Sequence, residues 1–201
     1  KTLFLLLFSG LKWGKLATSG GSMLLSLAVY ASIWGWRYAA GFIALLFAHE
    51  MGHYVAARQR GLDVGAPAFI PFVGAWIALK DKPVDVETEA YIALAGPVVG
   101  TGAALAVYLW ARAEDSALLL AISYAGLFLN LFNLLPLSPL DGGRVTAVLS
   151  PRIWFLGAPI LAALMIYRPS PTLLIVVILA VPQLISAWHY DPHAPENIAY
   201  Y

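Results

Sequence analysis

Two histidines and a glutamate stand at a spacing that could hold and use a metal ion. His49, Glu50 and His53 belong to the run His-Glu-Met-Gly-His. Residues four apart lie on one face of a helix, so both imidazoles could bind the same ion. The glutamate between them could take a proton from a water on that ion. An alternative is that the histidines only bond neighbouring helices, with Glu50 neutral or paired.

The surroundings of this run are apolar. The chain has 201 residues, of which 61% are hydrophobic and 11% are charged, whereas soluble domains are about half apolar and a quarter charged. Ionisable groups are costly inside an apolar span and usually mark function there. The net charge of +1 gives no footprint for nucleic acid, and the absence of cysteine excludes disulfides and thiolate ligands. The composition therefore predicts a membrane protein.

The apolar stretches predict the fold class. A membrane-spanning helix needs about 20 apolar residues. The sequence predicts an all-α membrane protein, a polytopic bundle of about six transmembrane helices, at residues 22–36, 38–59, 89–110, 116–135, 153–167 and 172–188. We expect residues 1–201 to form a single domain with its core at 41–149. Its other parts are an interfacial segment at 1–20, a C-terminal helical hairpin at 153–189 and a tail at 190–201.

Basic residues predict the orientation of the bundle. With the N-terminus inside, nine lysines and arginines fall on the cytoplasmic side (Lys1, Lys12, Lys15, Arg58, Arg60, Lys80, Lys82, Arg144 and Arg152) and three outside (Arg37, Arg112 and Arg168). This is the bias of multi-pass proteins. Both termini are then cytoplasmic. At about 1.5 Å per residue, the histidines lie roughly 15 Å below the cytoplasmic end, in a site that opens toward the cytoplasm.

Two stretches are too rich in glycine and proline to span as helices, residues 61–83 and 135–143. Irregular backbone at membrane depth is stable only where protein or a water-filled cavity satisfies its polar groups. We therefore expect both stretches to line a cavity. The segment from Phe69 to Ile77 favours short membrane-embedded strands or a re-entrant loop.

A third ligand is needed, because catalytic zinc takes three protein ligands and keeps one position open. Asp141 is the favoured candidate, since it lies on the second broken stretch and is followed directly by two glycines. The alternatives for Asp141 are an Asx turn that opens a helix, or a salt bridge with Arg144. The other carboxylates are predicted in loops, at the start of a span or in the tail.

One run of small residues and four further polar residues have less specific interpretations. The run from Gly96 to Gly100 predicts close helix packing, with a cavity-shaping role as its consequence. Asn130 could bond another helix, and Asn133 could either do the same or contact substrate. His189 and His193 are also four residues apart, but Pro192 prevents a regular helix between them. We therefore interpret both as tail residues next to the membrane.

Three motifs in this order resemble the site-2 protease family of intramembrane metalloproteases. They are the His49–His53 run, the Gly96-Pro-Val-Val-Gly100 run, and Asn133-Leu-Leu-Pro-Leu-Ser-Pro-Leu-Asp141-Gly-Gly-Arg144. The resemblance implies that His49, His53 and Asp141 bind Zn²⁺, that Glu50 is catalytic, and that Asn133 contacts substrate. It also implies a compact type without a peptide-binding insertion.

The expected function is that of an intramembrane zinc endopeptidase. It would cut the transmembrane segments of single-span, membrane-tethered regulators, such as an anti-sigma factor, within the lipid bilayer. One alternative is a membrane zinc carrier or sensor without hydrolysis. Another is a membrane metalloprotease with a glutamate as third ligand and a prenylated substrate. The sequence predicts no nucleic-acid partner and no particular oligomeric state.

Overall fold

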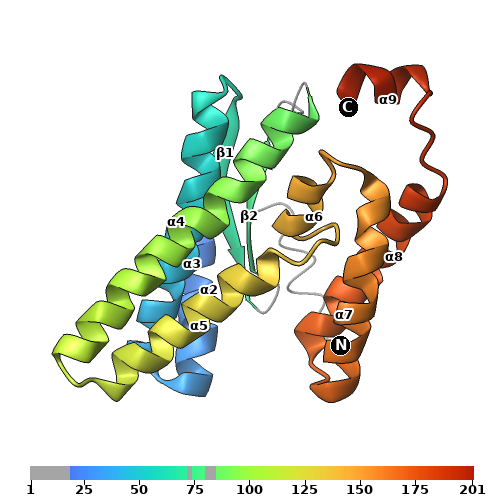
Figure 1. Ribbon diagram of the computed structural model, residues 1–201. Helices are drawn as coiled ribbons and strands as arrows, with labels where there is room; N and C mark the ends of the chain where they lie inside the picture. Colours follow the sequence, from blue (N-terminus) through green and yellow to red (C-terminus); the bar gives the residue numbers. More distant parts are fainter. Residues whose placement is uncertain (1–18, 72–73, 80–84) are drawn as a thin grey trace, which may run out of the picture.

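The computed structural model describes residues 19–71, 74–79 and 85–201, so the predicted interfacial segment lies almost wholly outside it. Figure 1 shows long helices around one small antiparallel sheet. In chain order the elements are α2 (Ser19–Trp34), α3 (Trp36–Gln59), β1 (Val64–Ile70), β2 (Gly74–Leu79), α4 (Val86–Ala113), α5 (Ala117–Asn133), α6 (Asp141–Thr146), the 3-10 turn η2 (Pro151–Ile153), α7 (Trp154–Tyr167), α8 (Pro171–Trp188) and α9 (Pro195–Tyr200).

Helix α4 is the centre of the arrangement. It packs against α3 on one side, against α5 on another, and against the short helix α6 near its start. Figure 1 shows α4 running beside α3, with α6 to one side of it. Elements far apart in the chain are thus brought around one helix, and α4 can form a common wall for groups from α3, α5 and α6.

Local signals set the ends of these helices, some of them earlier than predicted. Gly35 has φ 82°, a left-handed conformation that favours glycine, and it separates α2 from α3. The second predicted span therefore begins at Trp36 rather than at residue 38. Helix α4 begins at Val86 because the Asp85 carboxylate accepts a hydrogen bond from the backbone N–H of Thr88 at 2.6 Å.

The broken stretch after α3 forms a hairpin of two strands. β1 pairs with β2 in antiparallel register, with Phe69 opposite Ala75 and Ile70 opposite Gly74. Phe69 is buried in the cluster that α2 and α3 form, and its backbone N–H donates to the Ser22 hydroxyl at 3.0 Å. The sheet therefore lies against α2 and α3. Its depth in a membrane stays a prediction.

The C-terminal helices that follow η2 lie next to each other. α7 and α8 pack together, and their buried cluster of Leu137, Leu161 and Ala180 includes a residue of the loop after α5. The predicted tail contains one short helix, α9. The segment between α8 and α9 is held in part by Arg152, whose guanidinium donates to the backbone oxygen of Tyr190 at 3.1 Å.

The distribution of polarity is that of a protein surrounded by lipid. Among the described helices, α4 and α8 are long and apolar enough to cross a membrane, whereas α2, α5 and the η2–α7 segment are apolar but shorter. Leu109 and Ile166 are 67% and 84% exposed, while Glu50 is only 5% exposed. Large apolar side chains of these helices thus face outward while the Glu50 carboxyl faces inward, as expected in a bilayer. The count of six spans stays a prediction.

The α3–α4 contact generates a prediction about Gly52. A Cβ atom at this residue would lie 2.4 Å from the backbone oxygen of Ala95 on α4, which is a steric clash. We expect Gly52→Ala to force the helices apart and to destabilise the fold by about 1–3 kcal/mol. Thermal unfolding of the purified protein in detergent measures this effect.

Gly102→Ala is the matched control, because a Cβ atom there meets nothing within 4 Å. Alanine is favoured over glycine inside a helix by about 1 kcal/mol, so this variant should melt at or above the wild-type temperature. Equal melting of Gly52→Ala and wild type would contradict the close packing of α3 on α4.

Candidate metal centre

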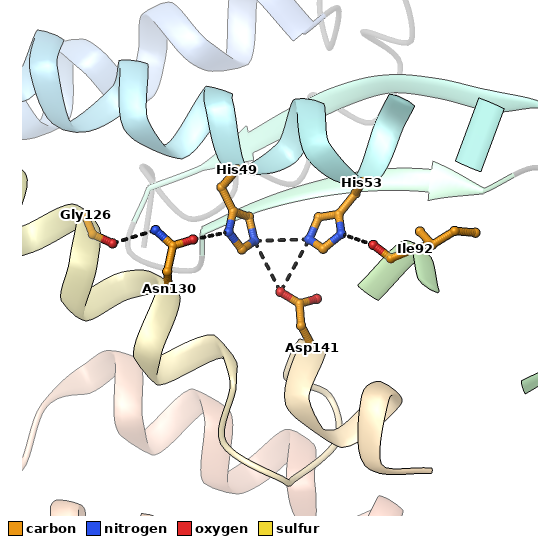
Figure 2. Close-up of polar contacts among 6 residues, drawn as sticks. All are labelled: His49, His53, Ile92, Gly126, Asn130 and Asp141. Carbon is orange, nitrogen blue, oxygen red and sulfur yellow. Dashed lines mark hydrogen bonds and ion pairs between the residues drawn. The ribbon is translucent and has the colours of Figure 1, made fainter. Parts of the chain in front are cut away.

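Helix α3 presents both histidines of the motif to one side. The two imidazole rings lie 4.7 Å apart, centroid to centroid, and their Nε2 atoms are 3.1 Å apart. His49 is buried and His53 is half-buried. Figure 2 shows both Nε2 atoms directed at the same point below the helix. The four-residue spacing therefore places both imidazoles on one face of α3, as the sequence predicts.

Asp141 reaches the same point from another part of the chain. It is the first residue of α6, and its Oδ2 atom lies 3.2 Å from His49 Nε2 and 3.4 Å from His53 Nε2. The alternative of a salt bridge with Arg144 does not occur, since the Arg144 guanidinium pairs instead with Glu89 at 3.0 Å. The structure thus brings together the three residues that the sequence proposed as ligands.

The position of Asp141 depends on how tightly α6 folds back onto the loop before it. A Cβ atom on Gly142 would lie 2.2 Å from the backbone oxygen of Leu134, and one on Gly143 would lie 2.2 Å from the backbone nitrogen of Ser138. The Trp154 indole N–H donates to the Gly143 oxygen at 2.8 Å and so ties α6 to α7. The paired glycines after Asp141 are therefore required by close packing.

Hydrogen bonds on the far side of each ring determine which nitrogen carries the proton. His49 Nδ1 lies 2.8 Å from Asn130 Oδ1, and His53 Nδ1 lies 2.8 Å from the backbone oxygen of Ile92. Both partners are acceptors, so each neutral imidazole must carry its proton on Nδ1. Each Nε2 atom then presents a lone pair to the other ring and to the Asp141 carboxylate.

Three lone-pair donors that face one point repel each other unless a positive charge lies between them. A single proton can bridge only two of these atoms, whereas one metal ion can accept a lone pair from all three. Ligand atoms bound to zinc tetrahedrally at about 2.0–2.1 Å are about 3.3–3.4 Å apart, close to the 3.1, 3.2 and 3.4 Å found here. His49, His53 and Asp141 therefore fit a tetrahedral metal ion with one position left open.

Glu50 lies beside the candidate metal ligands and is not one of them. The group that could hold an ion consists of the two histidines and Asp141. The carboxyl of Glu50 is buried close enough to interact electrostatically with both histidines and with Asp141. This placement suits a group that moves protons next to an ion.

The two asparagines of α5 have different environments. Asn133 ends α5 and is half-buried, and its proposed contact with substrate stays a prediction. Asn130, one turn earlier, is the residue that bonds His49. The sequence suggested that Asn130 could bond another helix, and it does bond α3, but the sequence did not identify His49 as its partner. The available signal was its spacing, because a residue one turn before Asn133 lies on a similar helix face.

A polar network lies at the start of α4, on the side of α6. Glu89 accepts from the Arg144 guanidinium through one carboxylate oxygen and from the Tyr200 hydroxyl through the other. Burial, together with this bond to Glu89, raises the pKa of Tyr200 above its ordinary value. The network fastens α9 to α4 and α6, so part of the predicted tail folds back onto the elements that hold Asp141.

Other candidate groups stay apart from the centre. Asp63 pairs with Arg58 at 3.7 Å and is about half exposed. His189 is exposed, with its Nδ1 atom 2.9 Å from the backbone oxygen of Ile185, and His193 is exposed in the tail. Neither histidine belongs to a group of potential ligands within the described parts of the chain.

Part of the chain matches the sequence model of a known protein family. The model of peptidase family M50 matches residues 37–115, which include the histidine motif and the glycine run. A zinc metalloprotease of Methanocaldococcus jannaschii is 30% identical over 145 residues, covering 69% of this chain and 42% of that protein. Rip3 of Mycobacterium tuberculosis, whose name also describes a zinc metalloprotease, is 35% identical over 129 residues, covering 58% of this chain and 32% of Rip3.

The fold is shared with a solved structure. The site-2 protease from Methanocaldococcus jannaschii superimposes with a TM-score of 0.54 at 20% identity, covering 83% of this chain and 85% of that one. The chain spans less than half the length of the two relatives named above. The family match includes the motif residues on α3. This chain belongs to peptidase family M50, the site-2 protease family.

Proposed function

We propose that the chain is an intramembrane zinc endopeptidase, in which His49, His53 and Asp141 hold the ion. The observation that carries this proposal is the convergence of two imidazole lone pairs and a carboxylate oxygen within 3.1–3.4 Å of one another. The two relatives are both named as zinc metalloproteases, which supports zinc as the ion and hydrolysis as the reaction.

Glu50 is the proton-transfer group of the proposed reaction. Bound zinc supplies a Lewis acid that polarises the scissile carbonyl and makes water a nucleophile near neutral pH. Glu50 accepts a proton from the attacking water as the water oxygen bonds to the carbonyl carbon. When the C–N bond breaks, Glu50 delivers that proton to the leaving nitrogen, so peptide and water yield a carboxylic acid and an amine. The second proton of the water then passes from the acid to the amine, which leaves a carboxylate and an ammonium group.

The proposed substrate is the transmembrane segment of a single-span protein. The exposed surface of the helices is apolar, while the candidate centre is buried among them. A membrane-tethered regulator such as an anti-sigma factor fits this surface, and its cleavage would be regulated intramembrane proteolysis. Peptide bonds inside a helix are hydrogen-bonded internally, so the substrate must unwind before attack.

The β1–β2 hairpin could hold the unwound substrate. Each strand has one partner among the described residues, and the sheet packs on α3, the helix that carries both histidines. The outer edge of β2 can therefore pair with an extended peptide through backbone hydrogen bonds. In this role the hairpin supplies binding that does not depend on the substrate's side chains.

The site is proposed to open toward the cytoplasm. Arg58 and Arg60 lie where α3 ends, and Arg144 meets the first turns of α4 at this same end. Arg37 and Arg112 lie at the opposite ends of α3 and α4. The excess of positive charge supports a cytoplasmic location for the end of the bundle nearer the metal centre.

A zinc carrier or sensor is the alternative function. Transport through the bundle would require successive binding sites along a path. Within the described parts of the chain, His49, His53 and Asp141 form the only group of three potential ligands. Glu50 beside them has no necessary role in carriage but a direct one in hydrolysis. These observations favour the protease.

Glu50→Gln tests the proposed reaction. The amide keeps the size of the side chain but accepts no proton, so we expect cleavage of a single-span substrate to fall by at least about 100-fold. Zinc content should stay at about one ion per chain. Gel-based cleavage in detergent, together with metal analysis of the same sample, measures both. Unchanged cleavage would remove Glu50 from its role, and full zinc with no cleavage by the wild type would favour the carrier.

Asp141→Ala tests the ligand set. Loss of one of three ligands should leave less than about a tenth of the wild-type zinc after dialysis against a chelator, because two imidazoles alone hold the ion weakly. Asp63→Asn is the matched control, since that carboxylate is exposed and paired with Arg58. It should retain wild-type zinc. Retention of zinc by Asp141→Ala would show that the third ligand lies elsewhere.

Proline substitutions in β2 test the role of the hairpin. Successive backbone N–H groups point to opposite edges of a strand, so Trp76→Pro and Ile77→Pro remove donors from different edges. The variant that loses an outer donor should bind zinc as wild type does but cleave more slowly. The other should lose a bond to β1 and melt at a lower temperature. Wild-type cleavage rates in both variants would argue against edge pairing.

A further inference from the structure

Asn130 connects α5 to the metal centre through a fully buried amide. Its side chain is 1% exposed. The amide oxygen lies 2.8 Å from His49 Nδ1, and the amide nitrogen donates to the backbone oxygen of Gly126 at 2.7 Å. Figure 2 shows this chain of contacts leading from α5 through the His49 ring to Asp141.

The contact with Gly126 fixes which way the amide faces. A backbone oxygen can only accept, so the Asn130 nitrogen must point toward Gly126 and the Asn130 oxygen toward His49. The oxygen in turn requires a proton on His49 Nδ1. One side chain thus sets both the tautomer and the rotation of the ring, and it aims the Nε2 lone pair of His49 at the point shared with Asp141.

The two histidines are held by different means. The Nδ1 atom of His53 bonds the backbone oxygen of Ile92 on α4, which no substitution can remove. The Nδ1 atom of His49 depends on the side chain of Asn130. Asn130 is therefore the place where the orientation of a candidate ligand can be changed without altering a ligand.

The glycine run of α4 makes room for both arrangements. A Cβ atom on Gly100 would lie 2.3 Å from Asn130 Oδ1 and 2.9 Å from Asn130 Nδ2. A Cβ atom on Gly96, one turn earlier, would lie 2.2 Å from His53 Nε2. Gly100 thus faces the residue that bonds His49, and Gly96 faces His53 itself. The predicted cavity-shaping role of this run can therefore be specified. The space beside Gly100 is occupied by the Asn130 amide, and the space beside Gly96 by the His53 ring.

We propose that Asn130 is a positioning residue for His49, and that Gly100 is required because it leaves space for the Asn130 amide. The inference rests on the proposed metal site. Groups that hold a metal-bound histidine from behind fix its tautomer and raise its basicity, and their removal typically weakens metal binding about 10–100-fold. Asn130 acts through His49 and touches neither the ion nor the substrate.

The test is the dissociation constant for Zn²⁺, measured by competition with a chromophoric chelator in detergent. We expect Asn130→Ala to weaken zinc binding about 10–100-fold. Asn130→Asp keeps an acceptor for His49 Nδ1, so it should bind zinc within a few-fold of wild type. A purely structural role predicts no such rescue, because aspartate loses the donor to Gly126.

Ser123→Ala is the control for general damage to α5. The Ser123 hydroxyl is buried and donates to the backbone oxygen of Ala104 on α4 at 3.0 Å, away from the metal centre. The substitution should lower the melting temperature of the metal-free protein and leave the zinc dissociation constant unchanged. The visible spectrum of bound Co²⁺ should shift in Asn130→Ala and stay as in wild type in Ser123→Ala.

A double-substitution cycle tests the role of Gly100. Gly100→Ala alone should weaken zinc binding, since the new methyl group displaces the amide. In the Asn130→Ala background the space is empty, so the same change should cost little more, and the two effects should not add. Gly102→Ala, which meets nothing within 4 Å, should leave zinc binding at the wild-type value.

Two results would overturn the inference. One is wild-type zinc affinity in a folded Asn130→Ala variant. The other is an equal loss of affinity in Ser123→Ala and Asn130→Ala, which would assign the effect to helix packing. A wild-type chain that binds no zinc is a distinct outcome, since it refutes the proposed metal site and the role of Asn130 with it.

Discussion

The mutual repulsion of three lone-pair donors at one buried point is the constraint on which the rest of this structure depends. His49 and His53 are both held through Nδ1 by acceptors, so both Nε2 atoms face the Asp141 carboxylate without protons. Burial strengthens this repulsion, because an apolar interior screens charge poorly. Only a cation can make the arrangement favourable. The helices therefore preserve a site whose stability is linked to the ion it binds.

The packing of the helices follows from holding these donors at a fixed separation. α3 supplies two of them one turn apart, and α6 supplies the third from a helix folded tightly back onto its own loop. α4 packs against both elements, with Gly96 and Gly100 at the points where a side chain would displace His53 or Asn130. Glu89 on α4 further ties α6 and α9 together through Arg144 and Tyr200. α4 thus contacts both elements that carry the candidate ligands.

The sequence predicted those features that depend on local spacing and missed those that depend on tertiary contact. The four-residue spacing of His49 and His53 implies a shared helical face, and Asp141 stood out because of its broken, glycine-rich segment. The role of Asn130 was not predicted, since an asparagine on a span can face any neighbouring helix until the packing is known. The glycine run was interpreted as a packing motif, without the side chains that it accommodates. α3 begins at Trp36 rather than at residue 38 because Gly35 adopts a left-handed φ. The predicted tail contains the helix α9, which contacts α4.

The central claim is that one zinc ion is shared by two imidazoles of α3 and the carboxylate of α6. Anomalous diffraction from crystals of the zinc-loaded protein, recorded on both sides of the zinc absorption edge, tests it most directly. We predict a single strong peak within about 2.0–2.2 Å of His49 Nε2, His53 Nε2 and an Asp141 carboxylate oxygen. A peak bound by the histidines with Asp141 turned away, or zinc held only by the exposed histidines of the tail, would contradict the account.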